Sequence, residues 1–160
     1  MLLKDTMTIN VGDVAPDFEL PVHTGGTFRL SGHKGKSPVV LYFYPKDFTI
    51  NCTKEACSFR NGYDDIRKHG AQLIGISGDD VESHQKFARL HRLNFPLASD
   101  VSYEVCKKYG VLWLGGIRIK RLTFLVDKAG IVRGKFSHEV LIDRHLENVL
   151  LTLREIESPS

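Results

Sequence analysis

Two continuous apolar runs, separated by one amphipathic segment, constrain the fold of this chain most. Residues 39–44, VVLYFY, and residues 71–77, AQLIGIS, are apolar over nearly their whole length, as strands buried on both faces usually are. Residues from about 50 to 69 have the apolar spacing of a helix, and Gly70 is placed to end it. Because a helical crossover joins parallel strands, the pattern predicts a β-α-β unit at the centre of an α/β domain.

Further elements extend this unit on both sides. A hairpin is predicted over residues 17–30, turning at Gly25-Gly26, and strands are predicted at 122–127 and 131–137. Helices are expected at about 81–91, with Asp79 or Asp80 as its cap, and at 102–109 and 141–156. This order matches the thioredoxin fold. The sequence therefore predicts an α/β, thioredoxin-like fold with an N-terminal β-hairpin extension and a central mixed sheet flanked by helices.

Length and composition indicate one globular domain spanning residues 1–160, with short disordered ends expected at 1–8 and 157–160. The net charge of +3 is spread along the chain, so it does not favour a nucleic-acid partner. Apolar runs all fall short of the roughly 20 residues that span a bilayer. The opening MLLKDTMTIN also lacks the apolar core of an export signal, so we expect a cytoplasmic protein without a membrane partner.

The chain has three cysteines, too few for a disulfide scaffold, and two of them fall on the helix predicted from residue 50. Helical spacing puts Cys52 on one stripe with Ala56, Phe59, Tyr63 and Ile66, facing the protein body, and puts Cys57 about 140° away. Cys52 would thus lie in the first turn, where unpaired N–H groups and the helix dipole stabilise a thiolate. The preceding Thr49 can cap this helix or direct its hydroxyl toward whatever approaches the sulfur.

A disulfide between Cys52 and Cys57 cannot form while the helix is intact. Their Cα atoms would be about 8.6 Å apart, whereas a disulfide needs roughly 4.4–6.8 Å. Asn61-Gly62 is a poor helical dipeptide and should weaken the helix nearby. The spacing suits a switch in which one thiol attacks, the helix opens and the second thiol resolves the product. The alternative is that both are ordinary helix residues, with Cys52 filling the core.

The segment YPKDFTINCTKEAC, residues 44–57, resembles the active-site segment of the peroxiredoxins. Within that family it is most similar to the peroxiredoxin Q (bacterioferritin comigratory protein) branch. The family pattern Pro-x-x-x-Thr/Ser-x-x-Cys matches at Pro45, Thr49 and Cys52. The second cysteine of the branch, five residues further on, matches at Cys57.

The resemblance extends from about residue 9 to residue 153. VGDVAPDFEL is similar to the family's opening strand, and RLTFLVDKAGIVR is similar to the segment that supplies the active-site arginine, here Arg121. Two departures concern the shape of the pocket and its substrate preference. The branch usually has Pro-Gly where this chain has Ile50-Asn51, and an acidic residue where this chain has Phe48.

The resemblance implies a thioredoxin-dependent peroxiredoxin of the atypical two-cysteine type, without metal or other cofactor. Cys52 would attack hydrogen peroxide or an alkyl hydroperoxide, and Cys57 would resolve the sulfenic acid as an intramolecular disulfide after local helix unwinding. Thioredoxin or a glutaredoxin would then restore both thiols. Thr49 and Arg121 would donate hydrogen bonds to the reacting oxygens, and Pro45 would shield the sulfur. The branch is often monomeric, and we expect a monomer.

Other assignments compete at several positions. Arg118 and Lys120 lie beside Arg121, which would be a strand-end charge without the family resemblance. Cys106 shares one side of a short helix with apolar residues, which indicates a core position. A thiol redox sensor would share every residue named above. A thioredoxin-fold copper or zinc chaperone is disfavoured, because four residues rather than three separate the two cysteines.

Overall fold

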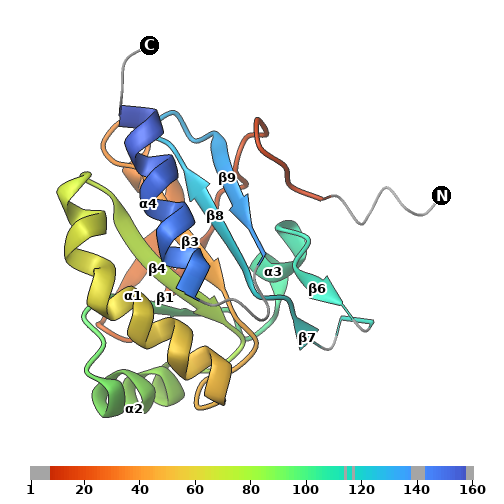
Figure 1. Ribbon diagram of the computed structural model, residues 1–160. Helices are drawn as coiled ribbons and strands as arrows, with labels where there is room; N and C mark the ends of the chain where they lie inside the picture. Colours follow the sequence, from red (N-terminus) through yellow and green to blue (C-terminus); the bar gives the residue numbers. More distant parts are fainter. Residues whose placement is uncertain (1–7, 114, 117, 138–142, 158–160) are drawn as a thin grey trace.

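The computed structural model describes residues 8–113, 115–116, 118–137 and 143–157, and the fold is shown in Figure 1. Its elements are β1 (Glu19–Pro21), β2 (Thr27–Arg29), the 3-10 turn η2 (Leu30–His33), β3 (Val39–Phe43), α1 (Ile50–Lys68), β4 (Gln72–Ser77), α2 (Val81–His91), β5 (Leu97–Ser99), α3 (Glu104–Lys108), β6 (Leu112–Trp113), β7 (Arg118–Ile119), β8 (Leu122–Val126), β9 (Val132–Phe136) and α4 (Asp143–Glu157).

A five-stranded mixed sheet, in the order β5-β4-β3-β8-β9, forms the centre of the domain. The two apolar runs become β3 and β4, which pair in parallel from Val39↔Gln72 to Phe43↔Ile76. On its other side β3 pairs antiparallel with β8, so that Phe43 lies opposite Leu122. This pairing brings the start of β8 beside the end of β3. The candidate site lies where these two central strands meet, at the end of β3 that leads into α1.

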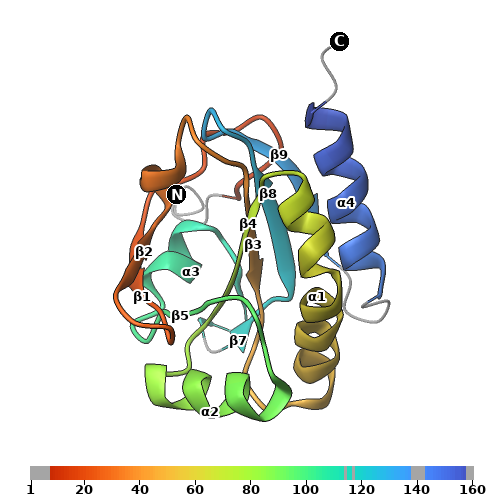
Figure 2. The ribbon, with the colours of Figure 1, turned by 90° about the vertical axis from the view of Figure 1, so that its left-hand side faces the viewer.

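Helices α1, α2 and α4 cover one face of the sheet, and the N-terminal hairpin together with α3 covers the other. Residues of α1, α2 and α4 pack on one face in a core that includes Cys52, Phe59, Phe87 and Val149. The hairpin β1–β2 and α3 pack on the other face, and Figure 2 shows these two layers edge-on. The predicted fold class, a thioredoxin-like α/β domain with a mixed central sheet, is confirmed.

Most predicted boundaries agree with the structure to within two residues. The hairpin turns at Gly25-Gly26 as expected, and Asp80 rather than Asp79 caps α2 by accepting a hydrogen bond from the Ser83 N–H at 2.8 Å. The expected start of the last helix at residue 141 and most of the two expected disordered ends lie outside the described residues. Glu157 belongs to α4 and accepts a hydrogen bond from His69 at 2.7 Å.

Three short strands were not predicted. β5 extends the sheet as a third parallel strand, paired with β4 from Gly75↔Leu97 to Ser77↔Ser99. β6 and β7 form a separate two-stranded sheet before β8. Each has only two or three residues, so none shows a period in the sequence.

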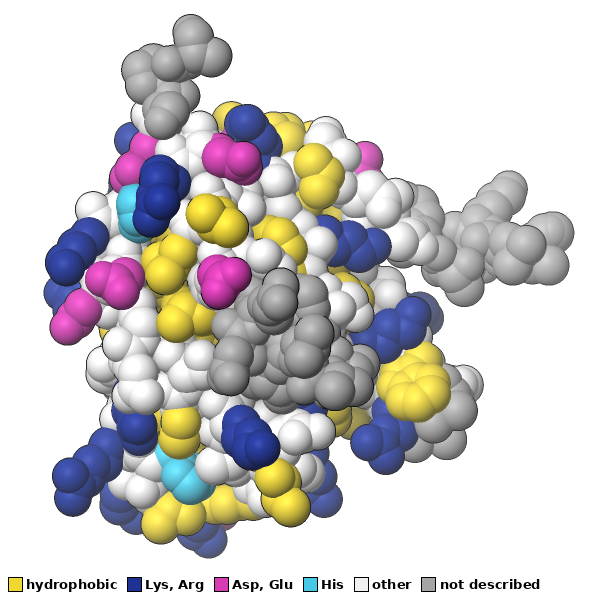
Figure 3. Space-filling model, viewed as in Figure 1, with side chains coloured by type: hydrophobic (Ala, Val, Ile, Leu, Met, Phe, Trp, Pro, Cys, Tyr) yellow, Lys and Arg dark blue, Asp and Glu magenta, His cyan; other side chains and the backbone are white. Residues whose placement is uncertain are grey.

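The face of the molecule shown in Figure 3 carries charged side chains of both signs between apolar ones. Lys and Arg side chains are scattered over the face shown in Figure 3 rather than gathered in one patch. Across the described parts of the chain, no helix combines the length and the apolar character needed to cross a membrane.

Candidate active site

Cys52 lies in the first turn of α1 and points into the protein. Four members of the stripe predicted from helical spacing, Cys52, Ala56, Phe59 and Ile66, are at most 1% exposed, and the fifth, Tyr63, is half-buried against the same core. They pack toward β3 and β4, because apolar side chains at this spacing occupy one face of the helix. The thiol therefore lies at the boundary between the sheet and the helix N-terminus.

Arg121 contacts the sulfur directly. Its Nη2 lies 3.4 Å from Cys52 Sγ, and its Nη1 donates to Glu55 Oε1 at 2.9 Å. All three side chains are buried, with Arg121 5% and Glu55 1% exposed. One guanidinium thus bridges the sulfur and a carboxylate one turn further along α1.

The electrostatic balance keeps this arginine charged. Burial alone lowers the pKa of the Arg121 guanidinium, but the neighbouring Glu55 carboxylate and Cys52 sulfur outweigh burial, and the pKa ends above its ordinary value. A permanent positive charge with fixed donors beside the sulfur favours a thiolate and can stabilise charge on an approaching oxygen.

The structure distinguishes Arg121 from its neighbours. Arg118 and Lys120 are exposed, whereas Arg121 immediately precedes β8 and points inward. Glu55 was missed from the sequence, where a glutamate on a helix looks like a surface residue. Its position three residues after Cys52 was the available signal, since such spacing puts two side chains on the same side of a helix.

The loop of residues 44–49 connects β3 to α1 and carries the other two predicted site residues. Pro45 is half-buried directly after the strand. Thr49 is the N-cap residue of α1, yet its hydroxyl does not cap the helix and instead donates to the Lys46 carbonyl at 3.1 Å. Of the two roles predicted for this hydroxyl, side-chain capping is therefore wrong.

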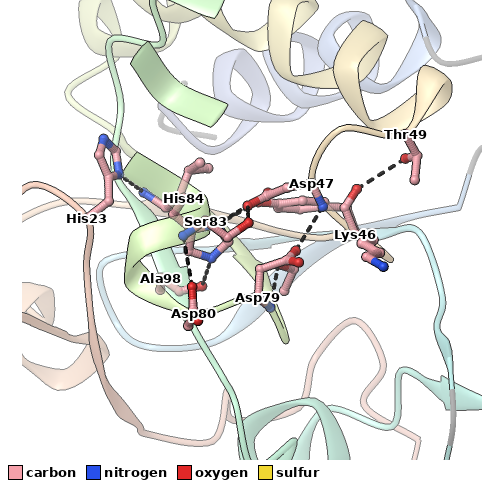
Figure 4. A network of polar contacts seen from close by, with 12 residues as sticks. His23, Lys46, Asp47, Thr49, Asp79, Asp80, Ser83, His84 and Ala98 are labelled. Carbon is pink, nitrogen blue, oxygen red and sulfur yellow. Dashed lines mark hydrogen bonds and ion pairs between the residues drawn. The ribbon is translucent and has the colours of Figure 1, made fainter. Parts of the chain in front are cut away.

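Beneath this loop lies a buried polar network that the sequence did not reveal (Figure 4). Asp47 and His84 are both completely or almost completely buried, and Asp47 Oδ2 lies 2.8 Å from His84 Nδ1. His84 shares one face of α2 with the buried residues Phe87 and Ala88, and this spacing was the available signal of its burial. The contact joins α2 to the loop before Cys52.

Asp47, Asp79 and His84 lie close enough together to be considered as metal ligands. However, His84 Nδ1 faces Asp47, and its Nε2 faces the Ala98 carbonyl at 3.0 Å. Both ring nitrogens are already directed at oxygen acceptors, and the geometry therefore assigns the cluster a hydrogen-bonding role.

Cys57 lies on the same unbroken helix as Cys52, as expected for free thiols. All three cysteines are free, and α1 is continuous from Ile50 to Lys68. Cys57 is half-buried in an open depression on the other side of the helix, bordered by residues of α1 and by Leu146 of α4. Closing a disulfide with Cys52 thus requires the intervening turn to unwind.

Comparison with known proteins agrees with this geometry. The model of the AhpC/TSA family matches residues 11–135. The chain is 41% identical over 153 residues to a protein of Coxiella burnetii named as a putative peroxiredoxin bcp, covering 90% of this chain and 98% of that one. It is 42% identical over 149 residues to the chloroplastic peroxiredoxin Q of Populus jackii, covering 92% of this chain and 70% of that one. The chain belongs to the peroxiredoxin Q branch of the AhpC/TSA family.

Solved peroxiredoxin structures are similar over almost the whole chain. Peroxidoxin BcpB of Mycobacterium tuberculosis superposes with a TM-score of 0.86 at 41% identity, covering 94% of this chain and 99% of that one. The bacterioferritin comigratory protein of Xanthomonas campestris, described for its alkyl peroxide reduction activity, gives 0.82 at 30% identity, with 94% and 98% covered. The protein is thus a thiol peroxidase.

The third cysteine of this peroxiredoxin is remote from peroxide chemistry. Cys106 is completely buried in the core on the hairpin side of the sheet. Burial first, and then the nearby Asp100 carboxylate, raise the pKa of its thiol far above the ordinary value. Since only the thiolate is nucleophilic, Cys106 is a core residue as predicted.

Proposed function

We propose that Cys52 is the peroxide-attacking residue of this thiol peroxidase and that Cys57 is the resolving residue. The contact between Arg121 and the Cys52 sulfur, with Glu55 on the same guanidinium, is the observation that supports this assignment most. It gives the first-turn cysteine the charged donor that a thiolate nucleophile needs, whereas Cys57 and Cys106 have no comparable contact among the described residues.

In the proposed reaction the Cys52 thiolate attacks one oxygen of hydrogen peroxide or of an alkyl hydroperoxide. A sulfur–oxygen bond forms while the oxygen–oxygen bond breaks, and the departing oxygen takes a proton and leaves as water or an alcohol. Arg121 and first-turn N–H groups donate to the two oxygens, and the Thr49 hydroxyl, whose proton is directed at the Lys46 carbonyl, accepts from the peroxide O–H. Half-buried Pro45 limits access of water to the sulfur. Alkyl peroxide reduction by the Xanthomonas campestris relative supports the inclusion of alkyl hydroperoxides.

Resolution makes this an atypical two-cysteine enzyme in our proposal. The Cys57 thiolate attacks the sulfenic sulfur of Cys52, the disulfide forms and water leaves. Thioredoxin or a glutaredoxin then reduces the disulfide by thiol exchange in a reducing cytoplasm, and the enzyme acts as a monomer. The open depression at Cys57 supports the choice of a protein dithiol, because it leaves that thiol approachable from outside.

Peroxide turnover coupled to a thioredoxin system tests the assignment. Cys52→Ser should abolish turnover, because a serine hydroxyl without an adjacent base is a poor nucleophile. Cys57→Ser should retain the fast first attack and accumulate sulfenic acid, seen by mass, that further peroxide overoxidises. Cys106→Ser is the matched control and should turn over like the wild type. Substantial turnover by Cys52→Ser would refute the proposed nucleophile.

A further inference from the structure

The buried network beneath the loop 44–49 is centred on the Asp47 carboxylate. Its Oδ1 accepts from the Tyr44 hydroxyl at 2.6 Å. Its Oδ2 accepts from the Ser83 hydroxyl and from His84 Nδ1, each at 2.8 Å. Tyr44 directly follows β3 and the other two donors lie on α2, so Asp47 ties the loop to the end of β3 and to α2 (Figure 4).

His84 is itself fixed at its far end. Its Nε2 lies 3.0 Å from the Ala98 carbonyl oxygen of β5, and the ring is completely buried. With both nitrogens facing acceptors, the ring has one orientation that satisfies both contacts. Asp47 is therefore connected to the parallel edge of the sheet and not only to a helix side chain.

The peptide unit between Lys46 and Asp47 is held on both of its polar groups. The Asp47 N–H donates to Asp79 Oδ2 at 2.8 Å, and the Lys46 carbonyl accepts from the Thr49 hydroxyl at 3.1 Å. Asp79 is in turn fixed by the Ser77 hydroxyl at 2.7 Å. The orientation of this peptide therefore determines where the Thr49 hydroxyl lies.

The backbone of Phe48, the residue after Asp47, gives an independent reason why the loop needs support. Phe48 has a φ of +69°, in the left-handed region that a residue with a Cβ rarely adopts. The conformation is retained between the hydrogen-bonded Asp47 on one side and contact of the Phe48 ring with Phe87, at 5.1 Å between centroids, on the other. Releasing Asp47 should let this residue relax and move the segment that leads into Cys52.

We propose that Asp47 and His84 are positioning residues for peroxide reduction. They hold the Lys46–Asp47 peptide, and through it the Thr49 hydroxyl, in the orientation required when peroxide reaches Cys52. The inference rests on the proposed roles of Cys52 and Thr49 in this peroxidase. The two proposed positioning residues contact neither the sulfur nor the peroxide, and Asp47 lies five residues before Cys52.

The test compares rates of single-turnover oxidation of Cys52 by hydrogen peroxide in wild-type protein and in Asp47→Asn. The variant keeps the size of the side chain and weakens the network, and we expect the second-order rate constant to fall roughly tenfold or more, the scale of small displacements in an active site. Ser83→Ala, which removes one of the three hydrogen bonds to Asp47, should give a smaller loss and serves if Asp47→Asn folds poorly. Asp100→Asn is the matched control, because Asp100 is equally buried and binds the N–H groups of Val105 and Cys106 instead.

A double-mutant cycle with Thr49→Val separates positioning from general loss of structure. If Asp47 acts through Thr49, Asp47→Asn should cost little further rate once the Thr49 hydroxyl is gone. Equal rates for wild type and Asp47→Asn, equal slowing in Asp100→Asn, or fully multiplicative effects in the cycle would each overturn the inference. A wild-type protein whose Cys52 does not react would instead refute the proposed function.

Discussion

Replacing Arg121 by methionine should slow the peroxide step and destabilise the protein, for two separable reasons. Methionine keeps a long unbranched side chain but removes the donors that lie 3.4 Å from Cys52 Sγ and 2.9 Å from Glu55 Oε1. Losing one donor at the reacting atoms slows an enzyme about a hundredfold or more, which is about 2.7 kcal/mol of transition-state stabilisation. Removing one member of a buried ion pair also costs about 3–5 kcal/mol of folding free energy, because the other charge stays buried.

A second substitution separates these effects. In Arg121→Met/Glu55→Gln no charge of the pair is left, so most of the folding free energy should return. The peroxide step should stay about a hundredfold slow, since the donor at the sulfur is still absent. Urea unfolding of the reduced proteins measures the first quantity, and rapid mixing with peroxide followed by thiol trapping and mass analysis measures the second.

The outcome for the double variant is decisive. If its peroxide rate returns together with its stability, Arg121 acts only by completing the fold. Arg118→Ala is the matched control, because Arg118 is an exposed arginine three residues away. If Arg118→Ala is slow and Arg121→Met is fast, the assignment of the active-site arginine is wrong.

Two further predictions concern α1. When the Cys52–Cys57 bridge has formed, as confirmed by mass, hydrogen exchange of the amides of residues 53–60 should become faster while β3 stays protected. Unchanged exchange in that segment would refute local unwinding. Gly62→Ala should destabilise the protein by about 1 kcal/mol or more in urea unfolding, because the new Cβ would clash with the Leu146 side chain of α4. Leu146→Ala in the same chain should remove most of that penalty.

The parts of the fold that were predictable are those with local signals. β3 and β4 are continuous apolar runs, and α1 has a five-residue stripe and a glycine at its end, so each could be recognised without knowledge of its partners. β5 could not, because Leu97, Ala98 and Ser99 form a strand only by pairing with β4. A three-residue strand has too few positions to show a period.

The residues of the candidate site also divide into those that the sequence revealed and those that it did not. Cys52 and Cys57 were identified by their spacing on one helix, and Arg121 by a resemblance in the segment around it. Glu55 and His84 were missed, because their burial depends on partners 66 and 37 residues away in the chain. From the sequence alone such a residue is assigned to the surface, because only the tertiary structure shows the partner that allows its burial.

Gly62 shows how a local signal can have a tertiary cause. The Asn61-Gly62 pair predicts a weak point in the helix, but Gly62 is buried where α4 crosses α1. The missing side chain leaves room for Leu146 to pack against the helix. The second half of α1 is therefore supported by α4, and the segment between Cys52 and Cys57 lies before this support.

The position of Glu55 links the two chemical steps of the proposed cycle. Glu55 lies between Cys52 and Cys57, inside the segment that must unwind before the disulfide can form. Its hydrogen bond to Arg121 holds that segment in helical form while the guanidinium contacts the sulfur. The interaction that favours attack on peroxide thus opposes resolution. Conversion of the thiolate to a neutral sulfenic acid removes the negative charge at Cys52 and weakens the contact of Arg121 with the sulfur. The opening of the helix therefore becomes less costly only after peroxide has reacted.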